Sequence, residues 1–115
     1  MREVKSTISY RDKEYDIVFN LNVMEAIQKR FGTIGAWGEL TDGKSGEVNI
    51  EALLFGFTEM INEGIEIRND ETGTNEPLLN SKKVARILSE IGIEQATNKI
   101  NGVVIESVAS EEKNV

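Results

Sequence analysis

The chain has 115 residues, and its 20 acidic and 13 basic residues give a formal net charge of −7. A chain of this length is typical of one domain and can bury a core unaided, so we expect a single domain over residues 1–115. Because the sequence contains no cysteine and no histidine, disulfides, thiolate metal sites, imidazole bases and histidine-ligated metals are excluded.

The first predicted element is a β-hairpin. Apolar side chains alternate with polar ones over residues 4–10 and again over residues 15–21, and a short polar connection at residues 11–14 separates the two runs. This alternation predicts two antiparallel strands with one buried face. A two-stranded hairpin is only marginally stable alone, so we expect that face to pack against the helices that follow.

A first helix is predicted over residues 22–31. Asn22 can cap its start, Glu25 stands three residues later as in a capping box, and Gly32 is placed to end it. The side chains expected to share its buried face are Met24, Ile27 and Phe31. Residues 32–48 contain five glycines and the only tryptophan, and this composition predicts a loop with at most a short turn.

The strongest helical pattern starts near Asn49. Its apolar residues recur at the spacing of one helical face, and they are Ile50, Leu53, Leu54, Phe57, Met60 and Ile61. We expect Gly64 to end this helix. The polar, glycine-containing residues 69–77 then predict a mobile loop.

A third helix is predicted between Ser81 as its cap and Gly92 as its stop. Its buried face would be formed by Val84, Ile87, Leu88 and Ile91. Together with the hairpin and one further helical segment, it completes an α+β fold. We expect an N-terminal β-hairpin followed by about four helices in a small, mainly helical single domain.

The last segment has two possible structures. Apolar residues at helical spacing from Ala96 to Val108 favour a helix, in which Ile105 would lie off the apolar stripe. Residues 102–105 are also compatible with a short strand. Residues 111–115 are expected to form a frayed tail.

The negative charge is concentrated in the middle third of the chain. Residues 39–76 carry ten acidic and two basic residues, whereas the thirds on either side are close to neutral. A phosphate backbone would be repelled there, so we expect no nucleic-acid partner. Ordinary solubility explains such a block, and a cationic protein partner is the alternative that it leaves open.

Targeting and membrane signals are also missing from the sequence. The longest run without a charged residue has eight residues, whereas a membrane-spanning helix needs about 20 apolar ones. The first residues contain no apolar signal region. We therefore expect a cytoplasmic location and no membrane partner.

Residues 38–45 match the phosphate-loop pattern G-x-x-x-x-G-K-S, which makes Gly43, Lys44 and Ser45 candidate nucleotide-binding residues. The motif needs a buried strand before it and a helix directly after it, but the preceding residues do not form a strand pattern and Gly46 follows. We therefore expect a surface loop and no bound cofactor. The sequence shows no catalytic constellation and no calcium-loop spacing, so we expect neither an enzyme nor a metal site.

The order of the parts resembles a known family. Residues 7–19 form the hairpin, and residues 20–32 read Asn-Leu-Asn-Val-Met-Glu-Ala-Ile-Gln-Lys-Arg-Phe-Gly. A leucine-rich helix, a Pro-Leu-Leu loop and two closing helices that end in Glu-Glu-Lys-Asn follow. This layout, most clearly residues 16–32, resembles the tail assembly chaperones of siphophages and related prophages.

The resemblance implies a role in virion morphogenesis. It implies a non-enzymatic protein of the host cytoplasm, absent from the mature virion, that binds the tape measure protein and, as a second partner, tail tube subunits. Two other functions stay open: a small nucleotide-binding protein that uses residues 38–45, and an acidic regulator or decoy that binds a basic protein. Calorimetry with Mg-ATP distinguishes the first of these, because a phosphate site would lose affinity in Lys44→Ala.

The resemblance also bears on the C-terminal residues. Many members of the family are made in two lengths by ribosomal frameshifting. Glu112-Lys113-Asn114 can be encoded GAA-AAA-AAC, which contains a slippery run. A frameshifted longer form and an ordinary polar tail are both compatible with the protein sequence, and the DNA sequence decides between them.

Two surfaces are candidates for binding a partner. Phe55 is predicted on the polar side of its helix, with Glu51 and Glu59 one turn before and after it. An exposed Phe between acidic residues could anchor a partly basic partner helix, or the helix is buried on two sides and Phe55 belongs to the core. A basic patch is predicted on the outer face of the third helix, and it consists of Lys82, Lys83 and Arg86. This patch could pair with the acidic third of a second copy, or be simply solvated.

Overall fold

The computed structural model describes residues 4–44 and 46–113, with side chains described over residues 6–44 and 46–105. A two-stranded antiparallel hairpin precedes five helices. Their bounds in chain order are β1 (Val4–Tyr10), β2 (Lys13–Phe19), α1 (Leu21–Phe31), α2 (Ile34–Thr41), α3 (Ile50–Thr72), α4 (Ser81–Ile91) and α5 (Ile93–Lys113). The predicted α+β class is confirmed, with five helices in the described part of the chain where about four were expected.

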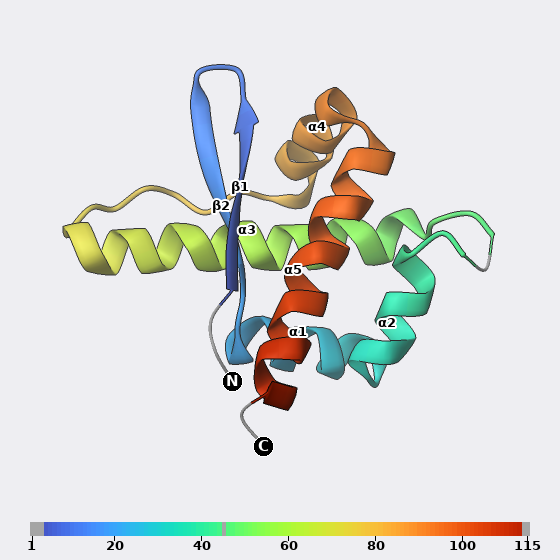
Figure 1. The fold of residues 1–115 in the computed structure, drawn as a ribbon. Coiled ribbons are helices and arrows are strands. Elements are labelled where there is room, and N and C mark those ends of the chain that lie inside the picture. The colour runs from blue at the N-terminus through green and yellow to red at the C-terminus, as the bar shows by residue number, and fades with distance from the viewer. Residues whose placement is uncertain (1–3, 45, 114–115) are drawn as a thin grey trace.

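The long helix α3 runs through the middle of the molecule (Figure 1). In that view the hairpin stands across α3, α1 and α2 lie below it, and α4 lies above it. β2 packs against α3, and β1 packs against α5, where Lys99 Nζ donates a hydrogen bond to the carbonyl oxygen of Thr7 at 2.7 Å. The core therefore forms where the buried face of the hairpin and the apolar faces of the helices meet around α3.

The hairpin closes through a turn of two residues, Arg11 and Asp12, because Tyr10 pairs directly with Lys13. Arg11 has a φ of 57°, which is the left-handed conformation that two-residue hairpin turns use. The predicted four-residue connection is therefore wrong, and β2 begins and ends two residues before the predicted strand. The predicted alternation is confirmed for Ile8, Tyr10, Tyr15, Ile17 and Phe19, which are all buried. It is wrong at the end of the second run, because Val18 on the other face of β2 is also buried and Leu21 is 65% exposed at the start of α1.

The N-cap of helix α1 lies two residues earlier than predicted. Its N-cap is Asn20, whose Oδ1 accepts a hydrogen bond from the backbone N–H of Val23 at 3.2 Å. The predicted cap, Asn22, lies inside the helix, and its side-chain amide donates to Glu63 Oε2 at 3.0 Å. The predicted capping box with Glu25 is therefore wrong, because the helix start has moved away from it.

The buried face of α1 also differs from the predicted one. Val23 and Ile27 are buried, whereas Met24 and Phe31 are half-buried at the edge of the core. Gly32 ends the helix as predicted, with a φ of 91°.

Residues 34–41 form α2, although the sequence predicted a loop there. Thr33 caps this helix, because its Oγ1 accepts the backbone N–H of Ala36 at 2.9 Å. Trp37 is 1% exposed, and its indole N–H donates to the carbonyl oxygen of Ala52 at 2.9 Å. Each glycine inside a helix costs about 1 kcal/mol, and burial of the large Trp37 side chain outweighs this cost. Because the glycine content is visible in the sequence and the burial is not, the composition predicted a loop.

Helix α3 starts at the predicted cap, Asn49, but it continues beyond Gly64 to Thr72. At Gly64 the hairpin crosses the helix so closely that a Cβ atom would lie 2.7 Å from the carbonyl oxygen of Asp16. This glycine therefore admits a neighbouring strand and does not end the helix. The C-cap is Gly73, which has the left-handed conformation with a φ of 70°.

The loop predicted over residues 69–77 is therefore wrong for residues 69–72, which form the last turn of α3. Residues 74–80 connect α3 to α4 without helix or strand. Side-chain amides of α3 bind this connection: Asn62 bonds to both backbone groups of Leu79, at 2.9 and 2.8 Å. Asn69 binds the backbone N–H and carbonyl of Glu76, both at 3.0 Å.

The two closing helices agree with the sequence in outline. The cap of α4 is Asn80, one residue before the predicted Ser81, and Gly92 ends the helix as predicted. The helix favoured for the last segment is confirmed, and the alternative strand at residues 102–105 is wrong. Ile105 is 67% exposed, as its place off the apolar stripe predicted.

The frayed tail was predicted over residues 111–115. Helix α5 continues through Lys113, so the first three of these residues are helical. Asn114 and Val115 lie outside the described residues.

Candidate interaction surfaces

Phe55 lies on the side of α3 that contacts α1. Its ring is half-buried and contacts Phe31 edge to face, with the ring centroids 5.6 Å apart. The guanidinium of Arg30 lies 5.0 Å from the centroid of the Phe55 ring and pairs with Glu51 through Nη2 and Oε1 at 3.0 Å. Phe55 is therefore neither the fully exposed anchor nor the core residue that the two predicted alternatives described, because Arg30 of the same chain covers part of its ring.

Glu59 belongs to a group of carboxylates along α3. Partial burial, together with the negative charges of Glu63 and Glu66, raises the pKa of Glu59 above its ordinary value. Glu63 accepts hydrogen bonds from the side-chain amides of Asn20 at 2.7 Å and Asn22 at 3.0 Å. The carboxylate of Glu63 therefore forms hydrogen bonds within the molecule, which link α3 to the start of α1.

The basic residues predicted on α4 do not all point outward. Lys82 and Arg86 are exposed, whereas Lys83 is half-buried with its ammonium group 5.0 Å from the centroid of the Tyr10 ring. In Figure 1, α1 and α4 lie on opposite sides of α3. The six predicted partner-binding residues therefore do not form one continuous surface.

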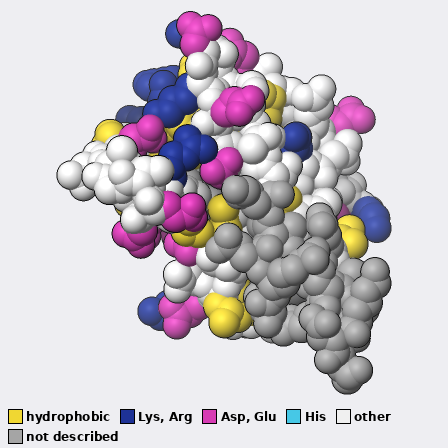
Figure 2. All heavy atoms as spheres, turned by 60° about the vertical axis from the view of Figure 1, so that its left-hand side comes forward, with side chains coloured by type: hydrophobic (Ala, Val, Ile, Leu, Met, Phe, Trp, Pro, Cys, Tyr) yellow, Lys and Arg dark blue, Asp and Glu magenta, His cyan; other side chains and the backbone are white. Residues whose placement is uncertain are grey.

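The acidic middle third of the chain does not produce an acidic face on the side shown in Figure 2, where lysine and arginine side chains lie among the acidic ones. Two ion pairs of the hairpin are consistent with this mixture. Arg68 Nη2 lies 3.0 Å from Asp16 Oδ2, and Lys13 Nζ lies 3.2 Å from Glu76 Oε2. Of these two pairs, only Lys13–Glu76 neutralises an acidic residue of the middle third, because Arg68 is itself one of the two basic residues of that third.

The phosphate-loop-like segment lacks the structural context that the motif requires. Its first glycine, Gly38, lies inside α2, and α3 begins only at Ile50. The backbone N–H of Lys44 donates to the carboxylate of Asp42 at 2.8 Å, so an acidic side chain occupies a donor that a phosphate would need. Gly43 has a φ of 75° in the turn, and Ser45 lies outside the described residues.

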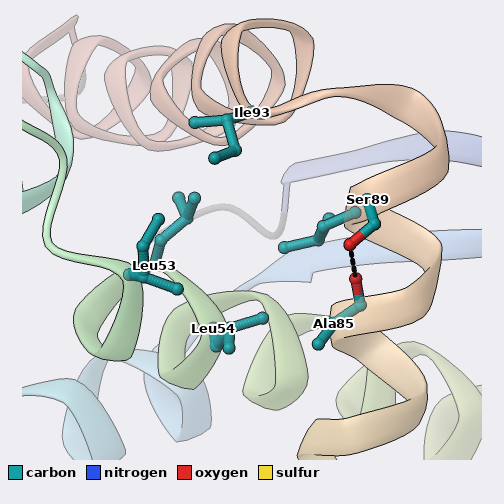
Figure 3. A pocket seen from close by; sticks show the side chains of 7 residues that line it. Leu53, Leu54, Ala85, Ser89 and Ile93 are labelled. Carbon is teal, nitrogen blue, oxygen red and sulfur yellow. Dashed lines mark hydrogen bonds between the residues drawn. The ribbon is translucent and has the colours of Figure 1, made fainter.

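An apolar groove that the sequence did not indicate lies between α3, α4 and the start of α5 (Figure 3). Its volume is about 420 Å³, and its walls include Ile50, Leu53, Leu54, Ala85, Leu88 and Ile93. Ile50 is 45% exposed and Ile93 is 48% exposed. Ile93 lies just before the apolar stripe predicted for the last helix, but nothing in the local sequence indicates that it lies near Ile50.

Within the described part of the chain, no group of acidic side chains is arranged to hold a metal ion. No helix among these residues is both long and apolar enough to cross a membrane. Comparison with known proteins gives no match: no family model fits the chain, and no curated protein or solved structure is significantly similar to it.

Proposed function

We propose that this chain is a non-enzymatic tail assembly chaperone of a siphophage or prophage, which binds the tape measure protein while the tail is built. The observation that carries the proposal is the order of the elements. A hairpin leads through Asn20 directly into α1, and α3, a Pro-Leu-Leu connection and two closing helices follow. Residues 16–32, where the resemblance to this family is clearest, comprise the end of β2, the cap and α1.

The physical character of the surface also supports the proposal. An assembly chaperone needs an adhesive surface on a stable body, and it needs no active site. The core around α3 supplies the body, and the groove with its half-exposed rims at Ile50 and Ile93 supplies apolar surface. Contiguous exposed apolar surface is a common mark of protein-binding sites.

The proposal extends to location and to further partners. We expect the chaperone to act in the host cytoplasm, to be absent from the mature virion and to bind tail tube subunits as a second partner. Self-association stays a prediction, in which exposed Lys82 and Arg86 pair with acidic residues of a second copy. Such surface pairs are weak and are screened by salt, so any self-association of this kind should decrease as salt is added.

Gene order and co-purification test the proposed function. In the genome that encodes this chain, we expect a tail tube gene upstream and a very long tape measure gene downstream. Co-expression of the tagged chain with that tape measure protein should yield a soluble complex on affinity purification. An unrelated acidic protein of similar size with the same tag is the control. If the chain binds neither the tape measure protein nor the tube protein, the proposal is refuted.

A further inference from the structure

Another hollow of the surface lies where the tip of the hairpin meets α4, and charged side chains line it. Its volume is about 470 Å³, and the residues around it are Tyr10, Arg11, Ala85, Arg86, Ser89 and Glu90. Four of these six residues are exposed, whereas Tyr10 is buried. Pockets for small molecules enclose most of their ligand. A hollow with mainly exposed walls is better suited to side chains that project from another protein.

Positive charge is concentrated around this hollow. The guanidinium carbon of Arg11 lies 5.1 Å from the centroid of the Tyr10 ring, and the ammonium nitrogen of Lys83 lies 5.0 Å from it. Arg86 lines the hollow from α4, and Lys82 is exposed one helical turn before it. Both lysines belong to the first turn of α4, where the helix dipole is also positive. The fold therefore brings two basic residues of α4 to a third one from the hairpin.

Two carboxylates near the hollow limit the kind of anion that fits. Glu90 lines the hollow one turn after Arg86, and the exposed Asp12 follows Arg11 in the hairpin turn. Among the described residues, no ion pair joins Arg11, Lys83 or Arg86 to a carboxylate. The cations are thus available to a partner. A long polyphosphate chain would be repelled by Glu90 and Asp12, whereas a short acidic run of a protein can avoid them.

The backbone at Arg11 indicates that its side chain matters more than the turn. Its φ of 57° is left-handed, a conformation that crowds any residue with a Cβ atom. Hairpin turns of two residues usually place glycine, asparagine or aspartate in such positions. Arginine therefore gives the turn no advantage, but from this position its guanidinium reaches the Tyr10 ring and the hollow.

We infer that this hollow binds carboxylate side chains in an acidic segment of a partner protein. Arg11 and Arg86 supply planar guanidinium groups, which bind carboxylates through paired N–H donors. Glu90 can accept a backbone N–H of the same segment, a group that a phosphate ion lacks. Charges act over only about 8 Å at physiological salt, so the local cations outweigh the net charge of −7. The inference rests on the proposed function only for the identity of the partner.

A short peptide with a run of glutamates, and its counterpart with glutamines at the same positions, test the inference. Each is titrated into the isotope-labelled chain at physiological salt, and the backbone amide signals are followed by NMR. The glutamate peptide should shift the signals of Tyr10, Arg11, Arg86 and Glu90 until they saturate. The glutamine peptide and inorganic phosphate should each bind at least about tenfold more weakly. Absent shifts, equal binding of both peptides, or tighter binding of phosphate would overturn the inference.

Variants of the chain locate the bound peptide. Arg11→Gly removes one guanidinium and also relaxes the turn, so this variant should fold as well as wild type. Arg11→Gly and Arg86→Gln should each weaken binding of the glutamate peptide by about threefold to tenfold. Arg86→Lys keeps the charge but not the planar group, and it should lose part of the affinity.

Lys29→Gln is the matched control, because it removes one positive charge at an exposed position on α1. Helix α1 lies on the opposite side of α3 from α4 (Figure 1). Lys29→Gln should therefore leave the affinity unchanged within about twofold, since salt screens charges at that distance. An equal loss in Lys29→Gln and Arg86→Gln would show that net charge and not the hollow attracts the peptide, which would contradict the inference.

Three further results separate this inference from the proposed function and from self-association. If the tape measure protein binds the wild-type chain and the double variant Arg11→Gly/Arg86→Gln equally, the inference about the hollow fails while the proposed function stands. If the glutamate peptide behaves as expected but no tail protein binds, the proposed function fails and the inference stands. If the chain alone forms a dimer that the double variant dissociates, acidic residues of a second copy fill the hollow and the inference is wrong.

Discussion

The two halves of α3 are held in the fold by different kinds of contact. In the first half, Leu53 and Phe57 are buried in the apolar core, and Trp37 packs against the helix. In the second half Ile65 is also buried, but Arg68 forms an ion pair with the hairpin and the amide of Asn69 binds the connection to α4. Apolar contacts leave a periodic pattern in the sequence, whereas polar contacts depend on which distant residues the fold brings together.

Both halves nevertheless contain a glycine at which another element approaches closely, and substitutions there should have the largest effects. A Cβ atom at Gly56 would overlap the buried indole of Trp37. A Cβ atom at Gly64 would lie 2.7 Å from the backbone oxygen of Asp16, which cannot rotate aside. We expect Gly56→Ala and Gly64→Ala each to lower the free energy of unfolding by about 2–3 kcal/mol, as overpacking does. Urea denaturation measures both.

A third glycine provides the control for these substitutions. Gly102 lies within α5, and an added Cβ would meet nothing within 4 Å. Gly102→Ala should therefore raise the free energy of unfolding by about 0.5–1 kcal/mol, because alanine costs less backbone entropy than glycine in a helix. A Gly64→Ala variant as stable as wild type would show that β2 does not cross α3 as closely as described.

Phe55→Ala tests the first half of α3 at the edge of its apolar contacts. The substitution removes the edge-to-face contact with Phe31 and the contact with Arg30. Because the ring is only half-buried, we expect a loss of about 1–2 kcal/mol, less than the 3–5 kcal/mol typical of a fully buried Phe. The exposed Ile105 serves as control, since Ile105→Ala should change stability by no more than about 0.5 kcal/mol. A loss of 3 kcal/mol or more, on the scale typical of buried Phe, would place Phe55 in the core.

The difference between apolar and polar contacts also explains which elements could be predicted from the sequence. The hairpin and the start of α3 follow from strong apolar periodicity, whereas the stripe of the last helix favoured a helix but also left a short strand open. The stop predicted at Gly64 was wrong because a glycine that ends a helix and a glycine that admits a neighbour look alike in one sequence. The short helix α2 was missed because the burial of Trp37, a tertiary effect, opposes its local glycine content.

The candidate surface was predictable only in part. Glu51 and Arg86 were recognised as exposed residues of amphipathic helices, but neither is among the residues that line the groove. The groove itself was not recognised, because it depends on how α3, α4 and α5 pack against one another. Periodicity indicates which face of a helix is apolar, but it does not indicate where two such faces leave a gap.

Asn69→Ala tests the polar contacts of the second half, and its effect should be mostly local. The substitution removes two bonds to the backbone of Glu76 and one from the hydroxyl of Thr74 at 2.9 Å. Partly exposed hydrogen bonds contribute little net stability, so we expect a global loss of about 1 kcal/mol or less. Hydrogen exchange should become faster over residues 73–80. Asn75→Ala, at an exposed position in the same connection, is the control and should leave the exchange there unchanged.

The smallest expected effect concerns Glu59, which lies where the two halves of α3 meet. Burial and the charges of Glu63 and Glu66 raise its pKa in the folded state above the ordinary value of 4.5. The folded protein therefore binds this proton more readily than the unfolded chain does, and stability decreases as the pH rises through the raised pKa. At pH 7, Glu59→Gln should raise the free energy of unfolding by about 0.2–0.5 kcal/mol, the usual cost of one like-charged pair a helical turn apart. This gain should disappear below about pH 4.5, where the carboxyl is neutral in both states. Glu39→Gln, at an exposed position on α2, measures the effect of net charge alone, and an equal gain in both variants would contradict the local cause.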